Sequence, residues 1–321
     1  MTLRATMLCF ASLLVGCTSG KTADQACSDQ AKANCALLDQ CRKNGVADTY
    51  GSLGVCIQRQ HDNCVASLMA MGTGNSPAHT EACALALPTE SCASFLNGTP
   101  VAACAQVTGA LASGAACAFS GQCASGFCAV PKGNGCGTCA NVPAAGDSCA
   151  TVTACGPGMT CTPMQVCEPW VMAGGACDNK TMVCAPGSSC VIAMTMTTGT
   201  CTADAATAGA TCDNRRQTGP ACDANQGLFC SSAKTCIAIN YVNAGSACGA
   251  QMMGMSDNLC TGGATCFAPG TGMAAMCLAD ALEGGACDIM VGPACMSPAR
   301  CVVSGAGTSG TCTANDASMC M

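Results

Sequence analysis

The sequence has few aromatic, histidine and charged residues. Its 321 residues include one tryptophan, two tyrosines, six phenylalanines and two histidines, and 9% of them are charged. So few aromatic side chains cannot supply the core of a large domain, and two histidines leave little material for acid–base catalysis. The formal net charge is −6, with no basic patch, so we expect no nucleic-acid partner.

Long hydrophobic runs are also missing. The apolar run at residues 7–16 (MLCFASLLVG) follows Arg4 and is shorter than the ~20 residues that a membrane-spanning helix needs. The LVGC motif at residues 14–17 resembles the lipobox of bacterial lipoproteins. This resemblance implies a signal peptide at 1–16, a lipid anchor on Cys17 and a tether at 17–21. An ordinary secretory signal cleaved near Gly20 is the alternative, and both interpretations predict export.

Cysteine, in contrast, is abundant, with 36 copies. Cys9 lies in the signal and Cys17 is the expected anchor, so 36 − 2 = 34 cysteines remain between Cys27 and Cys320. In an oxidising compartment this even number predicts up to 17 disulfides. Many such crosslinks can replace a hydrophobic core, because each one restricts the unfolded chain.

A zinc or metallothionein-like site is the alternative use of these thiols. Cys136 and Cys139 form the one CxxC pair, and no histidine follows His79 to complete a mixed site. No βαβ pattern surrounds the pair, so a redox motif is not indicated either. We therefore expect disulfide partners, no metal and no cofactor.

The first region, residues 22–108, carries helix signals and eight cysteines. Thr22 and Gln25 have the capping-box spacing, and the following helix is expected to end at Asn44-Gly45, where glycine can adopt the left-handed cap. At 100° per residue, three cysteines share one face of this helix, namely Cys27, Cys35 and Cys41.

Three more helices are predicted in this region. Ser52 can cap a second helix ending near residues 71–72, and Ser76-Pro77 has the N-cap and first-turn pattern of a third. Pro88 ends the third helix, and a short fourth runs from Thr89 to residues 97–98. The eight cysteines suffice for four bridges, so we expect a compact, disulfide-pinned helical domain.

From residue 114 to 321 the apolar periodicity disappears and a Gly-x-x-Cys unit repeats. The units start at Cys117, Cys149, Cys177, Cys212, Cys248 and Cys287, each with a glycine three residues earlier. Such a glycine suits a turn with positive φ. The third cysteine of the middle units follows a glycine in the same way, whereas Pro298 breaks this rule in the last unit.

Five units have four cysteines each, which allows three pairings per unit. We favour disulfides from the first to the third cysteine and from the second to the fourth, because the two interlocked loops would best order a unit that has no hydrophobic core. The expected pairs are Cys149–Cys161, Cys155–Cys167, Cys177–Cys190, Cys184–Cys201, Cys212–Cys230, Cys222–Cys236, Cys248–Cys266, Cys260–Cys277, Cys287–Cys301 and Cys295–Cys312.

The first unit has five cysteines, and Cys320 stands alone at the other end of the chain. Cys320 could pair with the odd cysteine of the first unit, pair between molecules, or begin a truncated seventh unit. These alternatives stay open at this point. The predicted fold class is small disulfide-rich: a disulfide-pinned α-helical domain, then a tandem array of loop-rich, cysteine-knot-like units with little regular secondary structure.

Two resemblances follow from these patterns. The cysteine and glycine spacing of residues 117–161 (CAFSGQCASGFCAVPKGNGCGTC, then CGPGMTC) resembles the N-terminal cysteine-rich region of Dickkopf proteins, which implies a stapled, loop-rich shape but no receptor binding. The whole layout of lipobox, eight-cysteine helical domain and Gly-x-x-Cys units is similar to cysteine-rich lipoproteins of myxobacteria, which implies an envelope location and no activity.

Few residues are candidates for chemistry. His61 and His79 lack a nucleophile in a recognisable motif, so we interpret them as solvated helix residues. Four aspartates directly follow cysteines, and without a DxDxDG-like run they are interpreted as turn residues rather than calcium ligands. They are Asp178, Asp213, Asp223 and Asp288.

Methionine gives a weak copper hypothesis. Thioethers could meet Cu(I) where thiols are oxidised, although methionine also fills irregular gaps. The candidates are Met252, Met253, Met255, Met273 and Met276, with Met194 and Met196 in a similar cluster. Arg215, Arg216 and Trp170 lie in loops and could be contact residues, but exposed loop positions are the simpler interpretation.

The expected function is a non-catalytic, lipid-anchored protein of the bacterial outer membrane or cell surface. Its loops between first and second cysteines would contact an envelope or extracellular protein or polysaccharide. An extracellular protease inhibitor is one alternative, because short bridged loops resist cleavage, and a methionine-rich periplasmic copper-binding protein is another. An enzyme is not expected, since the repeats lack a cluster of His, Asp or Glu.

Overall fold

The helical domain comes first in the chain. The computed structural model describes residues 20–320 apart from 153, 252–255 and 269–273, so Cys17 and the signal segment lie outside the described residues. The helices are α1 (Ala23–Cys41), α2 (Gly45–Tyr50), α3 (Leu53–Met69), α4 (Pro77–Ala86) and α5 (Cys92–Leu96), with 3-10 turns η1 (Leu87–Thr89) and η2 (Ala102–Cys104).

Three of the four expected helix starts are confirmed. The Thr22 hydroxyl accepts from the Gln25 amide at 3.2 Å, and the Thr22 amide donates to Gln25 Oε1 at 3.1 Å, which completes the capping box. The hydroxyl of Ser52 caps α3, and that of Ser76 caps α4. Each cap satisfies a backbone amide that has no partner within its helix.

Two predicted boundaries are wrong. The first helix ends at Cys41 instead of reaching Asn44-Gly45, because Asn44 adopts the left-handed conformation and Gly45 begins α2. A Cβ on Gly45 would lie 2.9 Å from the Leu38 carbonyl oxygen, so glycine permits this tight return. The last helix begins at Cys92 rather than Thr89, since Ser91 supplies its cap and the preceding residues form η1.

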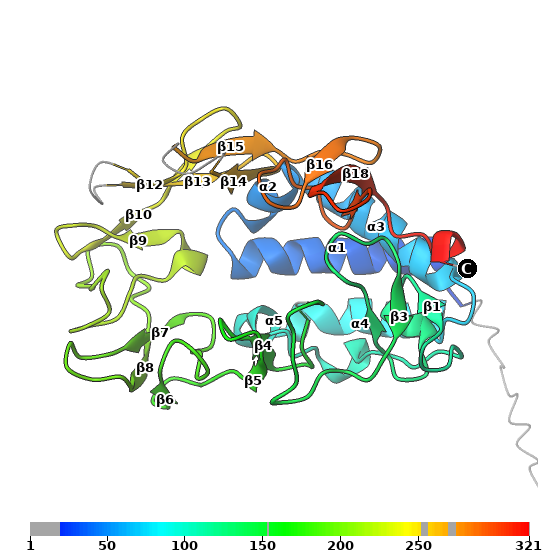
Figure 1. Cartoon of the computed structure of the whole chain (residues 1–321), viewed down its shortest axis with the longest axis horizontal. Helices are drawn as coiled ribbons and strands as arrows, with labels where there is room; N and C mark the ends of the chain where they lie inside the picture. The colour runs from blue at the N-terminus through cyan, green and yellow to red at the C-terminus, as the bar shows by residue number, and fades with distance from the viewer. Residues whose placement is uncertain (1–19, 153, 252–255, 269–273, 321) are drawn as a thin grey trace, which may run out of the picture.

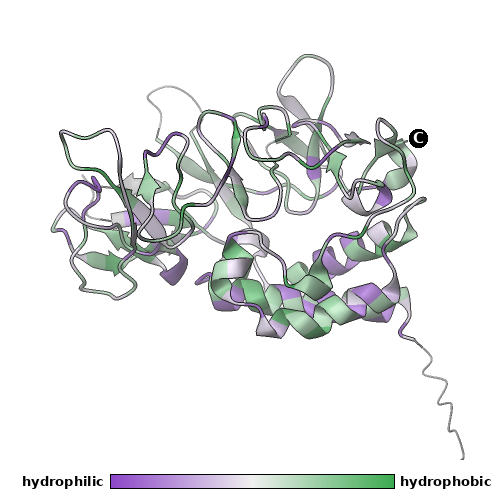
Figure 2. Cartoon of the chain, turned by 90° about the horizontal axis from the view of Figure 1, so that it is seen from below, coloured by the Kyte–Doolittle hydropathy of each residue, from purple (hydrophilic) through white to green (hydrophobic). Residues whose placement is uncertain are grey.

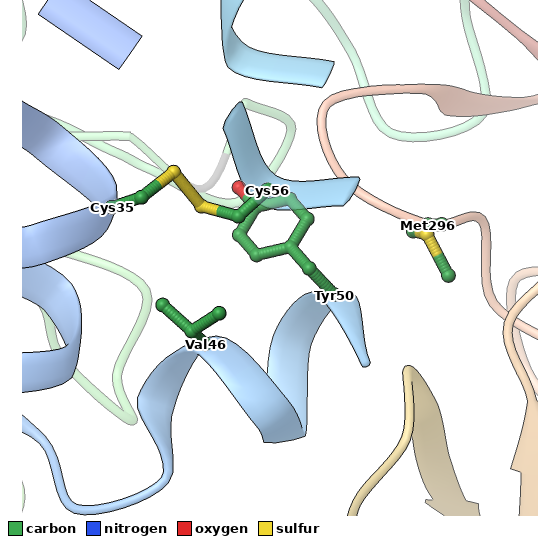
Figure 3. Close-up of a cluster of buried hydrophobic side chains, with 5 residues drawn as sticks. All are labelled: Cys35, Val46, Tyr50, Cys56 and Met296. Atoms are coloured by element: carbon green, nitrogen blue, oxygen red, sulfur yellow. A yellow bond between two sulfur atoms is a disulfide. The ribbon is translucent and has the colours of Figure 1, made fainter. Parts of the chain in front are cut away.

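Four disulfides pin these helices together, as expected for the fold class. Two bridges join α1 to α3, one joins α1 to α5 and one joins α4 to η2: Cys27–Cys64, Cys35–Cys56, Cys41–Cys92 and Cys83–Cys104. Figure 3 shows the Tyr50 ring beside the Cys35–Cys56 bridge, with Val46 from α2 and Met296 from the last repeat completing the cluster. Sulfur thus forms a large part of this small core.

The repeats consist of short strands and turns. Their strands are β1 (Ala116–Cys117), β2 (Cys128–Ala129), β3 (Gly137–Cys139), β4 (Met159–Cys161), β5 (Cys167–Pro169), β6 (Ala176–Cys177), β7 (Ser188–Val191), β8 (Gly199–Ala203), β9 (Leu228–Cys230), β10 (Cys236–Ala238), β11 (Asn240–Val242), β12 (Gly249–Gln251), β13 (Ser256–Cys260), β14 (Ala264–Phe267), β15 (Met276–Ala279), β16 (Ala286–Asp288), β17 (Arg300–Val303) and β18 (Ser309–Thr313), with 3-10 turns η3 (Ser120–Gln122), η4 (Ala224–Gln226) and η6 (Ala317–Cys320).

Every unit is built on an antiparallel hairpin that places its third and last cysteines opposite each other. In the second unit, for example, Cys161 pairs in register with Cys167. The two are not bonded to each other: each reaches back to an earlier cysteine, giving Cys149–Cys161 and Cys155–Cys167. All five four-cysteine units join first to third and second to fourth, with the pairs favoured from the sequence.

The repeat glycines have a shared backbone role. Each has a φ between 82° and 90°, and its amide donates to the carbonyl of the last cysteine of its own unit at 2.7–2.8 Å. In the second unit this bond runs from Gly146 to Cys167. A side chain would meet open space there, so the positive φ, not crowding, requires glycine. The Gly-x-x-Cys motif therefore closes each unit onto its own hairpin.

The repeat array bends around the helical domain and returns to its start. In Figure 1 the repeats run below α4 and α5, turn beyond the end of α1, and come back above α2 and α3. The first unit then meets the last, where the Val303 amide donates to the Gly133 carbonyl at 2.8 Å. The odd cysteine of the first unit, Cys136, is bonded to Cys320 across 184 residues. This bond closes the array into a ring.

The helical domain acts as the hub of this ring. Arg59 of α3 forms a two-pronged ion pair with Glu283 at 2.7 and 2.9 Å and also donates to the carbonyl of Met296 at 2.6 Å. At the opposite side, the Trp170 indole nitrogen donates to the Asn97 carbonyl at 3.2 Å. Trp170 therefore fastens the array to the hub and does not project from a free loop.

Figure 2 shows hydrophobic and hydrophilic residues interspersed along the helices and the repeats. Across the described part of the chain, none of the helices combines the length and the hydrophobicity needed for a transmembrane span. The disulfide content fits an exported protein.

Candidate functional site

A polar cavity of about 270 Å³ lies between three helices of the hub. α1 contributes Gln30 and Asn34, which are four residues apart and so share one face of the helix. Further polar side chains come from α3, α4 and the connecting segments, namely Gln60, Asn63, Ser67, Asn75, His79, Thr80 and Gln106. Amide and hydroxyl groups thus dominate the lining, and it holds no carboxylate, Lys or Arg.

A second cavity of about 520 Å³ continues from the first. The two share Gln30, Asn34 and Gln106, together with the Cys83–Cys104 bridge. The second cavity extends over α5 and the second repeat and adds Leu87, Glu90, Phe95, Asn97, Thr99, Pro100 and Met159. We call the two together the carboxamide groove.

Several groove side chains are held in place by their neighbours. Gln60 Nε2 donates to the Tyr50 hydroxyl at 2.6 Å, and Asn75 Nδ2 donates to the Ser67 hydroxyl at 3.1 Å. The side-chain carboxamide of Asn34 forms no hydrogen bond with any described residue. Positioned amides with unused donors and acceptors are what a binding site for a polar ligand needs.

Glu90 is the most unusual residue of the groove. It is 7% exposed, and no described residue forms a hydrogen bond or ion pair with its carboxylate. Burial raises the pKa of Glu90 above its ordinary value. The side-chain oxygen of Asn97 is also buried without a partner. The same cavity is therefore lined by a carboxylate without a protein donor, on a largely buried residue, and by a fully buried carboxamide oxygen without a partner.

This groove was not predicted from the sequence. Its lining comes from segments up to 129 residues apart in the chain, from Gln30 to Met159. Polar residues on a helix normally indicate a solvated face, so Gln30 and Asn34 attract no notice until the helices are packed. Glu90 likewise fits the expected first turn of a helix.

The two histidines have different surroundings. The His61 ring nitrogens lie 3.0 Å from Asp62 Oδ1 and 3.0 Å from Asp24 Oδ1, and the hydrogen bond with Asp62 is the largest cause of the raised His61 pKa. Within the described residues, no serine, threonine or cysteine hydrogen-bonds either ring nitrogen. His79 lines the first cavity of the groove.

The aspartates that follow cysteines stabilise turns. Asp178 accepts from the amides of Lys180, Thr181 and Met182, each at 2.8 Å, and these bonds, with that of Met182 largest, hold its pKa well below the usual range. The carboxylates of Asp213 and Asp288 accept several amide and hydroxyl hydrogens in the same way, and Asp223 caps η4. Their oxygens are occupied by the protein's own donors.

The copper candidates fall mostly outside the described residues, since these exclude Met252, Met253, Met255 and Met273. Met276 lies on β15, opposite Phe267. Met194 and Met196 are 83% and 64% exposed and line a shallow hollow with Arg215 and Arg216.

The cysteine triads that come within metal-ligand distance are already bonded. In the first unit, Cys117, Cys123 and Cys128 have sulfurs within 4.8 Å of one another, but all three belong to disulfides. A metal ligand must be a thiolate, which a disulfide sulfur is not. Cys136 and Cys139 belong to different disulfides, with Cys320 and Cys123.

No protein-family model matches the chain, and neither the curated proteins nor the solved structures contain a significant match.

Proposed function

We propose that the protein is a non-catalytic binding protein, lipid-anchored through Cys17 at the bacterial outer membrane or cell surface, and that it binds a neutral oligosaccharide in the carboxamide groove. The lipobox-like LVGC motif and the resemblance to cysteine-rich envelope lipoproteins support the anchor and the location. The 17 disulfides support an oxidising compartment. They also suit a protein that must persist outside the cell.

The chemistry of the groove carries this proposal. A carboxamide is uncharged and both donates and accepts, so a row of them matches the hydroxyl groups of a sugar chain without a large desolvation cost. The Glu90 carboxylate, which has no protein donor, and the buried, unpartnered Asn97 oxygen would accept from such hydroxyls. Two cavities that share lining residues, of about 270 and 520 Å³, offer room for several linked sugar rings rather than one small metabolite.

A non-catalytic role is supported by the surroundings of the titratable groups. Sugar hydrolysis normally uses two carboxyl groups that flank the bond to be broken. Glu90 is the one Asp or Glu among the described residues that line the groove. A binding site needs no second carboxylate.

The test is calorimetric titration of the oxidised protein with maltohexaose, cellohexaose and chitohexaose. At least one should bind, and Asn34→Ala and Glu90→Gln should each weaken binding about tenfold, the effect of losing roughly 1.4 kcal/mol of hydrogen bonding. Asn214→Ala, which removes an exposed carboxamide outside the groove, should leave binding unchanged. If none of the three hexasaccharides binds, or if the groove variants bind as well as the unchanged protein, the proposal is wrong.

A further inference from the structure

A further cavity, outside the carboxamide groove, lies where the first and last repeats meet and close the ring. It has a volume of about 450 Å³ and is bordered by the first repeat, the start of the second and the last. The Gly133–Val303 backbone hydrogen bond and the Cys136–Cys320 bridge hold these segments together. The cavity therefore exists only in the closed ring.

Arg300, at the start of β17, lines this cavity with a guanidinium group that forms a single protein hydrogen bond. It is partly buried, yet it makes one long hydrogen bond, 3.4 Å from Nη1 to the Gly135 carbonyl. No carboxylate of the described residues pairs with it, and burial alone lowers its pKa. A guanidinium has five N–H donors, so most of those on Arg300 have no protein acceptor.

Arg59 shows how this protein satisfies a structural arginine. Its guanidinium donates to both oxygens of Glu283 and to two backbone carbonyls. Arg300 has a comparable position between packed segments but lacks the carboxylate. Arg300 thus keeps donors that an anion entering the cavity can occupy.

The other residues that line the cavity indicate which kind of anion it would bind. Lys132 adds a second positive charge and has no ion-pair partner among the described residues. The lining also contains Ser120 and Asn134, and its apolar part consists mainly of Phe127, Val130, Pro131, Val152 and Ile289. In a molecule with a net charge of −6, a pocket with two unpaired cations and apolar walls selects a small anion that has an apolar part.

We propose that this cavity, the junction pocket, binds a small organic carboxylate. The planar guanidinium of Arg300 receives the two carboxylate oxygens, a geometry that arginine matches better than lysine. Lys132 strengthens the attraction from the rim, and the apolar part of the ligand packs on Phe127 and Ile289. This site is separate from the carboxamide groove and does not depend on the function proposed for it.

Titration of the full oxidised protein with hexanoate tests the proposal, with hexanamide and inorganic phosphate as comparison probes. Hexanoate should bind, hexanamide should bind at least tenfold more weakly because it has no charge, and phosphate should bind more weakly because it has no apolar part. Arg300→Gln should abolish hexanoate binding, and Arg300→Lys should weaken it about tenfold.

Two further variants separate binding from folding. Lys132→Gln, at an exposed position, should fold normally and weaken hexanoate binding about threefold. Arg215→Gln, which removes an exposed arginine far from the junction, should not change it. The proposal is overturned if hexanamide binds as well as hexanoate, if phosphate is the preferred probe, if Arg300→Gln binds hexanoate normally, or if hexanoate does not bind at all.

Discussion

At the scale of single residues, the repeat glycines control how each unit closes. Six positions share a positive φ and a hydrogen bond to the last cysteine of the unit, although the intervening loops differ in length and sequence. A side chain at such a position meets no atom within 4 Å, for example at Gly146. Any cost of substitution therefore comes from the backbone conformation alone.

We expect Gly146→Ala to destabilise the second repeat by about 1–2 kcal/mol, because an L-residue is strained at positive φ. Hydrogen-exchange rates of the Cys161–Cys167 hairpin amides should rise accordingly. Gly54→Ala in the first turn of α3 also meets open space, but without a positive φ, so it should be neutral or slightly stabilising. Equal effects of the two substitutions would contradict the interpretation.

At the scale of elements, the short helix α2 carries a buried carboxylate against the fifth repeat. Asp48 is 8% exposed, lies 3.8 Å from Arg42, accepts a hydrogen bond from Thr261, and has one oxygen without a partner. Burial is the largest influence and raises the pKa of Asp48 to about 6. Ionisation therefore costs more in the folded protein than in the unfolded chain.

The sign of the pH effect follows from this shift. Between about pH 4 and pH 6 the unfolded chain loses the Asp48 proton first, so the free energy of unfolding falls as the pH rises, by about 1–3 kcal/mol in total. Asp48→Asn should remove this part of the pH dependence in urea unfolding followed by helical circular dichroism. Arg42→Gln should extend the fall in the free energy of unfolding to higher pH, because the Arg42 charge lowers the Asp48 pKa. An Asp48→Asn variant with an unchanged pH profile would refute the prediction.

Elements defined by local chemistry were the predictable part of this fold. Thr22, Ser52 and Ser76 begin their helices as expected, because a cap depends on a few adjacent residues. The end of α1 was not predictable, since the return at Gly45 depends on close packing against Leu38. The carboxamide groove and the junction pocket were missed for a related reason: both combine residues from distant segments, and each residue alone looks like ordinary surface.

At the scale of the whole molecule, two side-chain fastenings hold the last repeat in the ring, in addition to backbone hydrogen bonds such as that from Val303 to Gly133. The Cys136–Cys320 bridge links the last repeat to the first, and Arg59 links it to the hub through Glu283 and two backbone carbonyls. The sequence alone left three possible roles for Cys320, because its disulfide partner depends on how the whole array of repeats curves. The curvature comes from contacts such as that of Trp170 with the hub.

Because these fastenings act on the same repeat, their removal should be non-additive. The Cys136→Ser/Cys320→Ser double variant should lose about 2–4 kcal/mol at the junction, seen as faster exchange of the Val303 amide, while the hub keeps the last repeat nearby. Adding Arg59→Met should release that repeat and increase the radius of gyration in solution scattering.

The control for this experiment is the loss of a bridge that closes a single unit. Cys149→Ser/Cys161→Ser should speed exchange in the second repeat and leave the Val303 amide protected, since that bridge closes a loop of 12 residues within one unit. If the double variant at the junction alone already expands the molecule fully, then Arg59 contributes no fastening. In that case the ring depends on one disulfide, and the junction pocket, which needs the closed ring, would be lost with it.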